Sequence, residues 1–394
     1  MAYYRSVGAV PRKRHTQFRR PDGGLYAEQL MGEEGFSSSS SLLYHRNPPT
    51  AIVDAVDIAH ESGALGDLLA TTTANKPLLP RHLLTHALAG GGDIVTGRKL
   101  LLGNDSVRLS TVSADTTSPL YRNALGDECV YLESGSAVLE SVFGSLPVTA
   151  GDYVVVPTST THRWVVAEPV RALVVEAKGH ITPPARYLSS EGQFLEHSPY
   201  CERDLRGPSD LLSHDDTEVE VYVRHRGGVT RYTYLNHPFD VVGWDGCLYP
   251  FALSIHDFEP ITGRLHQPPP VHQTFAGPGF VVCSFVPRLF DYHPLSIPAP
   301  YNHSNVDSDE VLFYVGGDFM SRKGAGIEMG SITIHPGGFI HGPQPGSVEA
   351  SIGKESTDEL AVMIDTFAPL GLGPAAGPCE DDGYAWTWSG RRPT

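Results

Sequence analysis

The chain has 394 residues and a formal net charge of −16 at pH 7, with a sequence pI of about 5.5. Such acidity excludes nucleic acid and anionic membranes as expected partners, because both bind basic surfaces. Hydrophobic residues make up 40% of the chain, and the 41 glycines and 32 prolines favour many turns and a β-rich architecture over long helices.

Two further features bear on the compartment. The five cysteines lie far apart, form no CxxC pair and are odd in number, as in a reduced cytoplasmic protein. The N-terminus lacks an apolar signal core, and no run approaches the ~18 consecutive apolar residues of a membrane helix. We therefore expect a cytoplasmic protein that does not span a membrane.

Residues 1–110 are expected to form an extended N-terminal arm and a β-rich region that packs on the first of two halves. The arm carries short basic patches at residues 12–14 and 19–20, which suit a subunit contact or a surface arm. The first half is expected at residues 111–180. Its apolar runs at 153–156 and 172–176 predict strands of a packed barrel or sandwich core.

Proline, serine and aspartate then become frequent in residues 181–216, which we interpret as a linker wrapped over a surface. The second half is expected at residues 217–370 and opens with a largely alternating, strand-like run at 218–224. Residues 371–394 form a Gly- and Pro-rich tail with Trp386 and Trp388, predicted to be an extended segment held by its aromatic residues.

The strongest chemical signal lies in residues 301–346. His303 and Glu310 lead into the apolar run 311–315, and His341 ends a second β segment that follows a Gly-rich loop. Two histidines and one carboxylate make up the facial-triad site typical of non-haem Fe(II) oxygenases, which leaves positions for O₂ and a chelating substrate. This ligand set suits Fe(II) or Mn(II), and the absence of a nearby cysteine pair argues against structural zinc.

The spacing of these residues resembles the cupin family. Its second motif is matched without a gap by Gly330, Pro336, Gly338 and His341. Its first motif is matched by His303, Glu310 and Gly317. Asn305 stands where the family has a second histidine, so that the site has two histidines and one carboxylate. The resemblance implies a mostly β fold with two cupin-like, jelly-roll β-barrel halves and short helices.

The chain also resembles itself, since residues 121–128 and 151–162 repeat the pattern of the two motifs. Glu128 and His162 take the places of the later glutamate and histidine, but Tyr121 stands in the position of His303. Two ligands rarely hold a catalytic metal, so we expect the first copy to be structural, with a degenerate metal site.

Three stretches are similar to the homogentisate 1,2-dioxygenase family: residues 12–19, 244–250 and 341–343. The likeness spans nearly the whole chain. It implies an Fe(II)-dependent dioxygenase that opens homogentisate with O₂ to maleylacetoacetate, in tyrosine and phenylalanine catabolism. It also implies a homo-oligomer, either a trimer or a hexamer.

The same resemblance assigns roles to residues. The iron ligands would be His303, Glu310 and His341, and the general base would be His266, since a histidine with a pKa near neutrality can accept a phenolic proton. His335 would lie behind the ligands or touch the substrate. The other expected substrate contacts are His272, Tyr301 and Phe319. Phe319 replaces a substrate-binding tyrosine of the better-known branch, whose hydroxyl contact Tyr314 or Tyr301 could supply.

The sequence is also compatible with other functions. The substrate could be gentisate or another hydroquinone acid, and the chain could be a non-enzymatic bicupin or a Mn(II) isomerase or decarboxylase that consumes no O₂. Arg322 and Lys323 lie in a loop at residues 319–328, where they could attract a carboxylate, but a solvated loop is the preferred interpretation.

Overall fold

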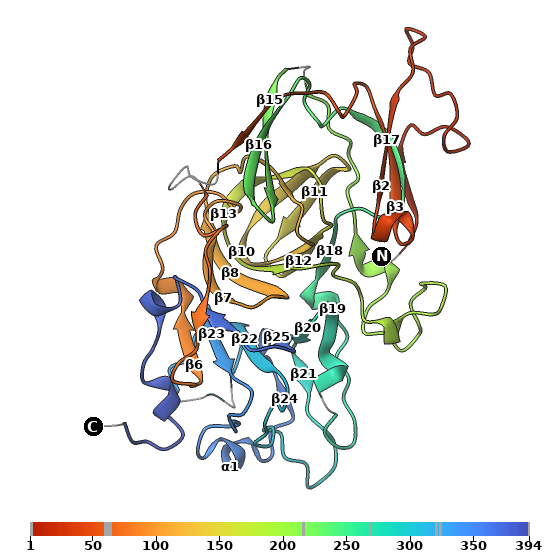
Figure 1. Ribbon diagram of the computed structural model, residues 1–394. Helices are drawn as coiled ribbons and strands as arrows, with labels where there is room; N and C mark the ends of the chain where they lie inside the picture. The colour runs from red at the N-terminus through yellow and green to blue at the C-terminus, as the bar shows by residue number, and fades with distance from the viewer. Residues whose placement is uncertain are drawn as a thin grey trace. The chain divides into compact units, whose positions relative to one another are not determined.

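The computed structural model describes residues 3–58, 65–214, 217–267, 269–319, 322 and 325–392. Over this described part the chain consists mainly of β-strands and turns, with short 3-10 helices and one α-helix, α1 (Ser347–Ser351) (Figure 1). The prediction of a mostly β, cupin-like fold with short helices is confirmed. Within the same ranges no helix is long and apolar enough to cross a membrane.

The chain divides into two compact units, each gathered from separate stretches. Unit 1 comprises Met1–Leu69, Gly90–Arg98 and Val112–Ser254, and unit 2 comprises Ala70–Ala89, Lys99–Thr111 and Ile255–Thr394. The five consecutive segments expected from the sequence stay a prediction.

Unit 1 contains two groups of paired strands. Strands β1, β17, β3 and β2 form a four-stranded sheet, and β10 pairs with β11, β12 and β13 in a larger one. The strands are β1 (Arg5–Gly8), β2 (Ala27–Gly32), β3 (Ser40–His45), β4 (Ile52–Asp57), β9 (Leu120–Asn123), β10 (Glu128–Ser141), β11 (Gly144–Thr149), β12 (Asp152–Val156), β13 (His162–Ala177), β14 (Leu205–Arg206), β15 (Val219–His225), β16 (Gly228–Tyr234), β17 (Val241–Gly246) and β18 (Phe251–Ser254). Its 3-10 helices are Glu34–Phe36, Ala185–Tyr187 and Glu202–Asp204.

The N-terminal arm is ordered, because its residues pair as strands. β1 and β3 flank β17 on either side in antiparallel register. Arg14 of the basic patch donates from Nε to the Asp245 carboxylate at 2.8 Å and from Nη2 to the Asp245 carbonyl at 2.9 Å. Two of the stretches that carry the family resemblance therefore contact each other inside unit 1.

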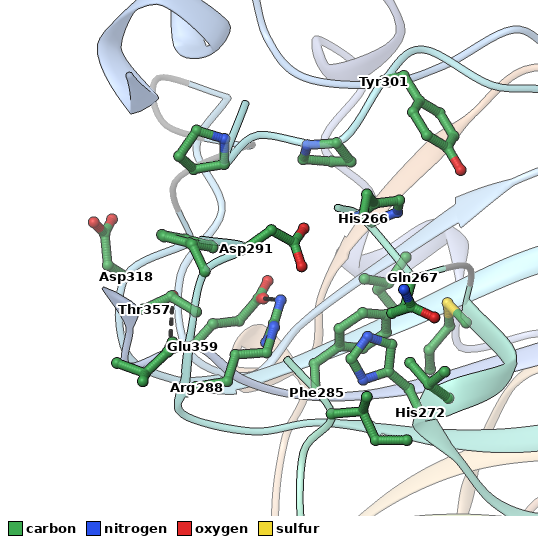
Figure 2. Close-up of a pocket in the computed structure, with 18 of the residues that line it drawn as sticks. His266, Gln267, His272, Phe285, Arg288, Asp291, Tyr301, Asp318, Thr357 and Glu359 are labelled. Atoms are coloured by element: carbon green, nitrogen blue, oxygen red, sulfur yellow. Dashed lines mark hydrogen bonds and ion pairs between the residues drawn. The ribbon is translucent and has the colours of Figure 1, made fainter. Parts of the chain in front are cut away.

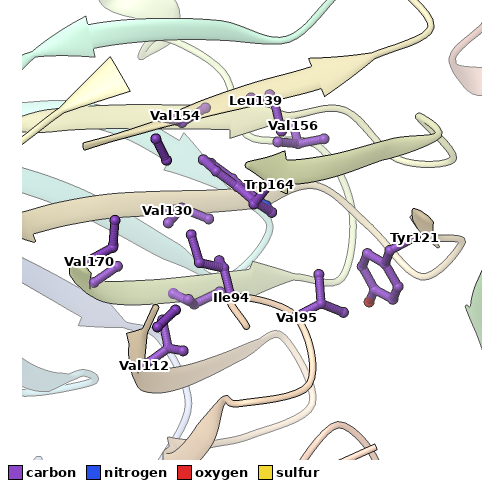
Figure 3. Close-up of a cluster of buried hydrophobic side chains, with 14 of the residues drawn as sticks. Ile94, Val95, Val112, Tyr121, Val130, Leu139, Val154, Val156, Trp164 and Val170 are labelled. Atoms are coloured by element: carbon purple, nitrogen blue, oxygen red, sulfur yellow. The ribbon is translucent and has the colours of Figure 1, made fainter. Parts of the chain in front are cut away.

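The core of unit 1 lies between the inward faces of β10, β12 and β13. Trp164 is fully buried there among aliphatic side chains that include Val130, Leu139 and Val154 (Figure 3). The rich supply of valine in these strands suits a pleated surface that is covered on its inner face. The strands predicted at 153–156 and 172–176 are confirmed as β12 and the end of β13.

Unit 2 is built on a six-stranded antiparallel sheet in the order β19-β20-β25-β22-β23-β6. β6 is contributed from far upstream in the chain and pairs with β23 at the sheet edge (Figure 1). The strands are β5 (Thr73–Ala74), β6 (Arg81–Leu84), β7 (Lys99–Gly103), β19 (Gln273–Gly277), β20 (Phe280–Phe285), β21 (Arg288–Leu289), β22 (Asp309–Gly316), β23 (Ser331–His335), β24 (Ser356–Thr357), β25 (Leu360–Thr366) and β26 (Gly371–Leu372), and β7 also pairs with β8 (Val107–Ala114). Its 3-10 helices include Thr85–Ala87, Ile255–Asp257, Pro269–His272, Gly377–Cys379 and Tyr384–Trp386.

The strand β22, near the centre of this sheet, carries part of the candidate site. β22 is buried along most of its length, so its run of apolar residues continues without the alternation of a half-exposed strand. Its predicted strand at 311–315 is confirmed. A small apolar cluster of Val281, Cys283 and Met363 packs with Leu312, and Met363 and Leu312 also line the cavity described below. All five cysteines of the chain, each within the described residues, are free thiols.

Candidate metal centre

Two loops bring the predicted histidines together. The backbones of His303 and His341 form an isolated antiparallel bridge, with N–H···O distances of 2.8 and 3.0 Å, and their rings lie 4.3 Å apart. Glu310, near the start of β22, faces both rings. One ligand atom from each of His303, Glu310 and His341 lies within 4.8 Å of the others, so the three residues can hold one metal ion.

Both histidines are hydrogen-bonded in the same way. Nδ1 of His303 lies 3.2 Å from the Tyr301 carbonyl, and Nδ1 of His341 lies 3.1 Å from the Phe339 carbonyl. A carbonyl oxygen can only accept, so each Nδ1 carries the proton and each Nε2 of a neutral ring presents a lone pair. These Nε2 atoms lie 3.4 and 3.3 Å from the two oxygens of Glu310.

The Nε2 lone pairs and the carboxylate oxygens would repel one another without a cation between them. Nε2 of His341 is buried and has no hydrogen-bond partner among the residues that the structure describes. A hydrogen bond to Glu310 raises the pKa of His303, because a proton on Nε2 can take the place of such a cation. Imidazole nitrogen and carboxylate oxygen are ligands that Fe(II) accepts, so the donor set fits that ion.

Glu310 is held in its charged form. Burial acts to raise its pKa, but the close contacts of His303, His335 and His341 outweigh burial and keep the pKa well below its usual value. The shortest of these contacts, 2.8 Å, is the hydrogen bond that Nδ1 of His335 donates. The site therefore favours the charged carboxylate beside two imidazole nitrogens.

His335 lies beside Glu310 and is not among the residues that line the cavity described below. The residue pairs with Glu310 across β22 and β23 and is fully buried. Burial, with the positive charge of Arg322, lowers its pKa to about 3, so the ring is neutral. Its Nδ1–H donates to Glu310, and its Nε2 accepts from the Tyr384 hydroxyl at 2.8 Å.

Tyr384 and Trp388 connect the C-terminal tail to the site, a role that sequence reasoning missed. The Trp388 Nε1–H donates to the Gly342 carbonyl at 3.1 Å, next to His341. The only signal in the sequence was the group of aromatic residues in a tail otherwise rich in glycine and proline.

A cavity of about 330 Å³ opens in front of the cluster, a volume that suits a small-molecule site. The residues predicted as general base or substrate contacts that lie on its wall are His266, His272 and Tyr301 (Figure 2). Leu312 and Met363 supply apolar surface, and the polar wall includes Arg288, Asp291 and Glu359. Phe319 does not line the cavity and instead packs on Tyr314, with ring centroids 4.9 Å apart.

The two cavity histidines differ in environment. His266 is exposed and meets the Tyr301 ring edge-on at 5.2 Å. His272 is buried against Phe285, with ring centroids 4.5 Å apart, and its Nδ1 has no hydrogen-bond partner among the described residues. Burial, then the charge of Arg288, lowers the pKa of His272 to about 3. His272 is therefore a neutral ring with an open hydrogen-bonding position.

The preferred interpretation of residues 319–328 as a solvated loop is wrong for Arg322. Its side chain is buried, donates to the Gly342 carbonyl, lies 3.4 Å from the Tyr314 hydroxyl and stands over the Trp388 ring. These contacts compensate the loss of water around the guanidinium. Lys323 lies outside the described residues.

Asp365 is a further carboxylate near the centre that the sequence analysis did not single out. It stands on β25 directly opposite Glu310 of β22. Its Oδ1 is buried and has no hydrogen-bond partner among the described residues. Burial, reinforced by the negative charge of Glu310, raises the pKa of Asp365 to about 7.

Unit 1 contains the same framework around a different centre. Tyr121 pairs with His162, as His303 pairs with His341, and Nδ1 of His162 again bonds to the carbonyl two residues earlier, that of Thr160 at 3.0 Å. Here the guanidinium of Arg98 reaches Glu128, with Nη1–Oε1 and Nη2–Oε2 distances of 2.9 and 2.7 Å. Arg98 is buried, so an arginine supplies the positive charge beside this glutamate.

A second group of metal-binding residue types lies in unit 1 at Glu33, Asp127 and His180. Asp127 already accepts the N–H groups of Thr158 and Ile181, at 2.8 and 2.9 Å. His180 lies 3.3 Å from the same carboxylate, and that hydrogen bond raises the pKa of His180. The contacts are those of a structural ion pair.

Comparisons with known proteins agree with this chemistry. The family described as "Homogentisate 1,2-dioxygenase N-terminal" matches residues 3–255. The chain is 42% identical over 395 residues to "Putative dioxygenase SSO1533" of Saccharolobus solfataricus, covering 98% of this chain and 99% of that protein. It is 25% identical over 418 residues to homogentisate 1,2-dioxygenase of Rhodopseudomonas palustris strain BisB18, covering 97% and 90% of the two chains.

Among solved structures, hydroquinone 1,2-dioxygenase from Sphingomonas sp. TTNP3 is similar over 24% of this chain and 70% of that one, with 14% identity and a TM-score of 0.21. That TM-score is too low to bear on function. The family match and the full-length relative decide the assignment: the chain belongs to the homogentisate 1,2-dioxygenase family. It is accordingly a dioxygenase.

Proposed function

We propose that the protein is an Fe(II)-dependent dioxygenase that opens the ring of homogentisate with O₂ to give maleylacetoacetate, in tyrosine and phenylalanine breakdown. Both oxygen atoms enter the product, so the reaction needs no external reductant. The observation that carries the proposal is the geometry of His303, Glu310 and His341, whose two Nε2 atoms face one carboxylate beside the cavity.

The iron would be held by these three residues. When bound, Fe(II) would lower the pKa of a coordinated phenol and make O₂ reactive toward the ring. His335 would keep the Glu310 carboxylate in orientation from behind, because its Nδ1–H donates to Oε1. The hydrogen bond from Tyr384 to Nε2 fixes the tautomer in which Nδ1 carries that proton.

The cavity wall would bind and orient the ring. We assign His266 as the base that accepts a phenolic proton, since it stands at the exposed side of the cavity beside Tyr301. The buried His272 would use its free Nδ1 for a hydrogen bond to the substrate.

Arg288 would meet the substrate carboxylate. Its Nη2 lies 3.0 Å from the Glu359 carboxylate and its Nη1 donates to the Val286 carbonyl, which orients the guanidinium on the cavity wall. A guanidinium has five N–H donors, so further donors are left for a carboxylate. This contact is specific to an acidic ring substrate and does not itself distinguish homogentisate from gentisate.

The proposal is tested by O₂ uptake after anaerobic loading with Fe(II). Homogentisate should consume one O₂ for each ring opened, and Arg288→Met should raise KM by about 10-fold or more with a smaller change in kcat, because a charged hydrogen bond to substrate is lost. Glu359→Gln alone is the matched control for disturbing the ion pair.

Gentisate and hydroquinone are the comparison substrates. O₂ uptake with gentisate alone would support the proposed iron site and show that gentisate, and not homogentisate, is the substrate. No uptake with any of the three, from protein shown to contain iron, would contradict the dioxygenase proposal and favour O₂-independent cupin chemistry.

A further inference from the structure

The two units place a second carboxylate at the same point of the same framework. In unit 1 Glu128 stands opposite Glu176 across β10 and β13, and in unit 2 Glu310 stands opposite Asp365 across β22 and β25. Directly opposed residues on antiparallel strands project from the same face of the sheet. Each unit therefore directs a pair of acidic side chains toward one centre.

In unit 1 the pair is neutralised by two guanidinium groups. Arg98 binds Glu128 through both Nη atoms and reaches Glu176 at 3.0 Å. Arg224 forms a second ion pair with Glu176. All four side chains are buried, and the two negative charges are balanced by two positive charges. This balance is what a buried cluster of ionised groups requires.

In unit 2 no guanidinium group forms an ion pair with Glu310 or Asp365 among the described residues. Oδ1 of Asp365 is buried without a hydrogen bond. Arg322 also carries its charge near Glu310, but it donates to the Gly342 carbonyl and lies within reach of the Tyr314 hydroxyl. Two carboxylates thus face a centre from which the arginines of unit 1 are missing, and a divalent cation carries the same total charge as those arginines.

We propose that Asp365 is a positioning residue of the metal site, which completes its charge and accepts a hydrogen bond from a water or hydroxyl bound at the cation. This rests on the proposed function, since it needs the cation held by His303, Glu310 and His341. Asp365 lies outside that group of ligands, so it acts through what the cation binds. Its free Oδ1 would be the accepting atom.

The proposed role predicts that the Asp365 charge lowers the stability of the metal-free protein, whereas a purely structural role would predict that it raises this stability. Without the cation, Asp365 is a half-buried carboxylate next to Glu310, with its Oδ1 buried and without a hydrogen bond among the described residues, so its charge destabilises the folded chain. With the cation bound, the negative charge of Asp365 attracts the cation and strengthens its binding. Asp365→Asn keeps the shape and removes the charge, so it should weaken metal binding while leaving the metal-free fold at least as stable.

The test is anaerobic titration of the metal-free, full-length protein with Fe(II) alone, together with thermal unfolding of the metal-free protein. We expect Asp365→Asn to raise the Fe(II) dissociation constant by about 10- to 100-fold, the usual effect of losing a group that supports a metal site from outside the ligands. Its Tm without metal should equal or exceed that of the wild type. Asp382→Asn, a change of the same charge on an exposed side chain, should alter neither value.

Asp365→Ser serves as a second charge-removing variant and should weaken Fe(II) binding to a similar degree. Equal Fe(II) affinity in wild type and in both variants would overturn this inference and leave the proposed function intact. A lower metal-free Tm in Asp365→Asn, with unchanged affinity, would show a structural role instead. A wild type that binds no Fe(II) would overturn the proposed function and this inference together.

Discussion

At the scale of single residues, the tautomer of each histidine determines which ring nitrogen can bind a metal ion. The paired contacts of Nδ1 with backbone carbonyls occur at His303, His341 and His162, so the same local geometry recurs in both units. The two units differ in what holds the nearby glutamate. In unit 2 Glu310 faces the Nε2 atoms of both histidines, whereas in unit 1 the equivalent Glu128 forms an ion pair with Arg98.

Arg98 gives a prediction at this scale. Arg98→Met would leave Glu128 buried without its partner, so we expect the free energy of unfolding to fall by about 3–5 kcal/mol in urea titrations. The matched control is Arg163→Met, which removes a more exposed ion pair with Glu140 and should cost about 1 kcal/mol or less. Equal losses for the two variants would mean that burial does not control the strength of the Arg98 pair.

At the scale of elements, one aspartate in each unit ties the start of a strand to two segments farther along the chain. Asp309 accepts the N–H groups of Gly337 and Leu370, at 2.8 and 2.7 Å. Asp127 binds the N–H groups of Thr158 and Ile181 in the equivalent way. The Asp309 contact fixes the loop that leads from β23 to His341.

These two aspartates make a matched pair of variants. An Asn side chain can accept only one of the two N–H groups, so Asp309→Asn and Asp127→Asn should each cost about 1–3 kcal/mol of stability. Only Asp309→Asn should also weaken Fe(II) binding, because it loosens the loop that carries His341. The check is Fe(II) titration alongside urea unfolding, and a loss of Fe(II) affinity in Asp127→Asn would count against this division of roles.

At the scale of the whole molecule, the sequence predicted the β-rich class and the strands that carry the site. His303, Glu310 and His341 could be found because glycines and prolines at fixed spacing mark the turns around them. Arg98 and Asp365 could not, because the fold brings them to the glutamates from other parts of the chain. Arg98 stands beside Lys99, and Asp365 stands between Ile364 and Thr366, and neither local pattern indicates a glutamate partner.

The same reasoning explains the remaining differences. Arg322 seemed to belong to a solvated loop, since nothing in its local sequence indicates the tail residue Trp388 that covers it. Tyr384 is likewise brought to His335 by the fold alone. The trimer or hexamer implied by the family resemblance stays a prediction, as does the cytoplasmic location.

The most direct test of a single metal site in unit 2 is the number of Fe(II) ions bound by each chain under anaerobic titration, in wild type, His341→Ala and His162→Ala. We predict one Fe(II) per chain in the wild type, none bound tightly in His341→Ala, and one in His162→Ala, because Arg98 supplies the positive charge in unit 1. Two Fe(II) per chain, or a loss of Fe(II) in His162→Ala with retention in His341→Ala, would contradict this prediction.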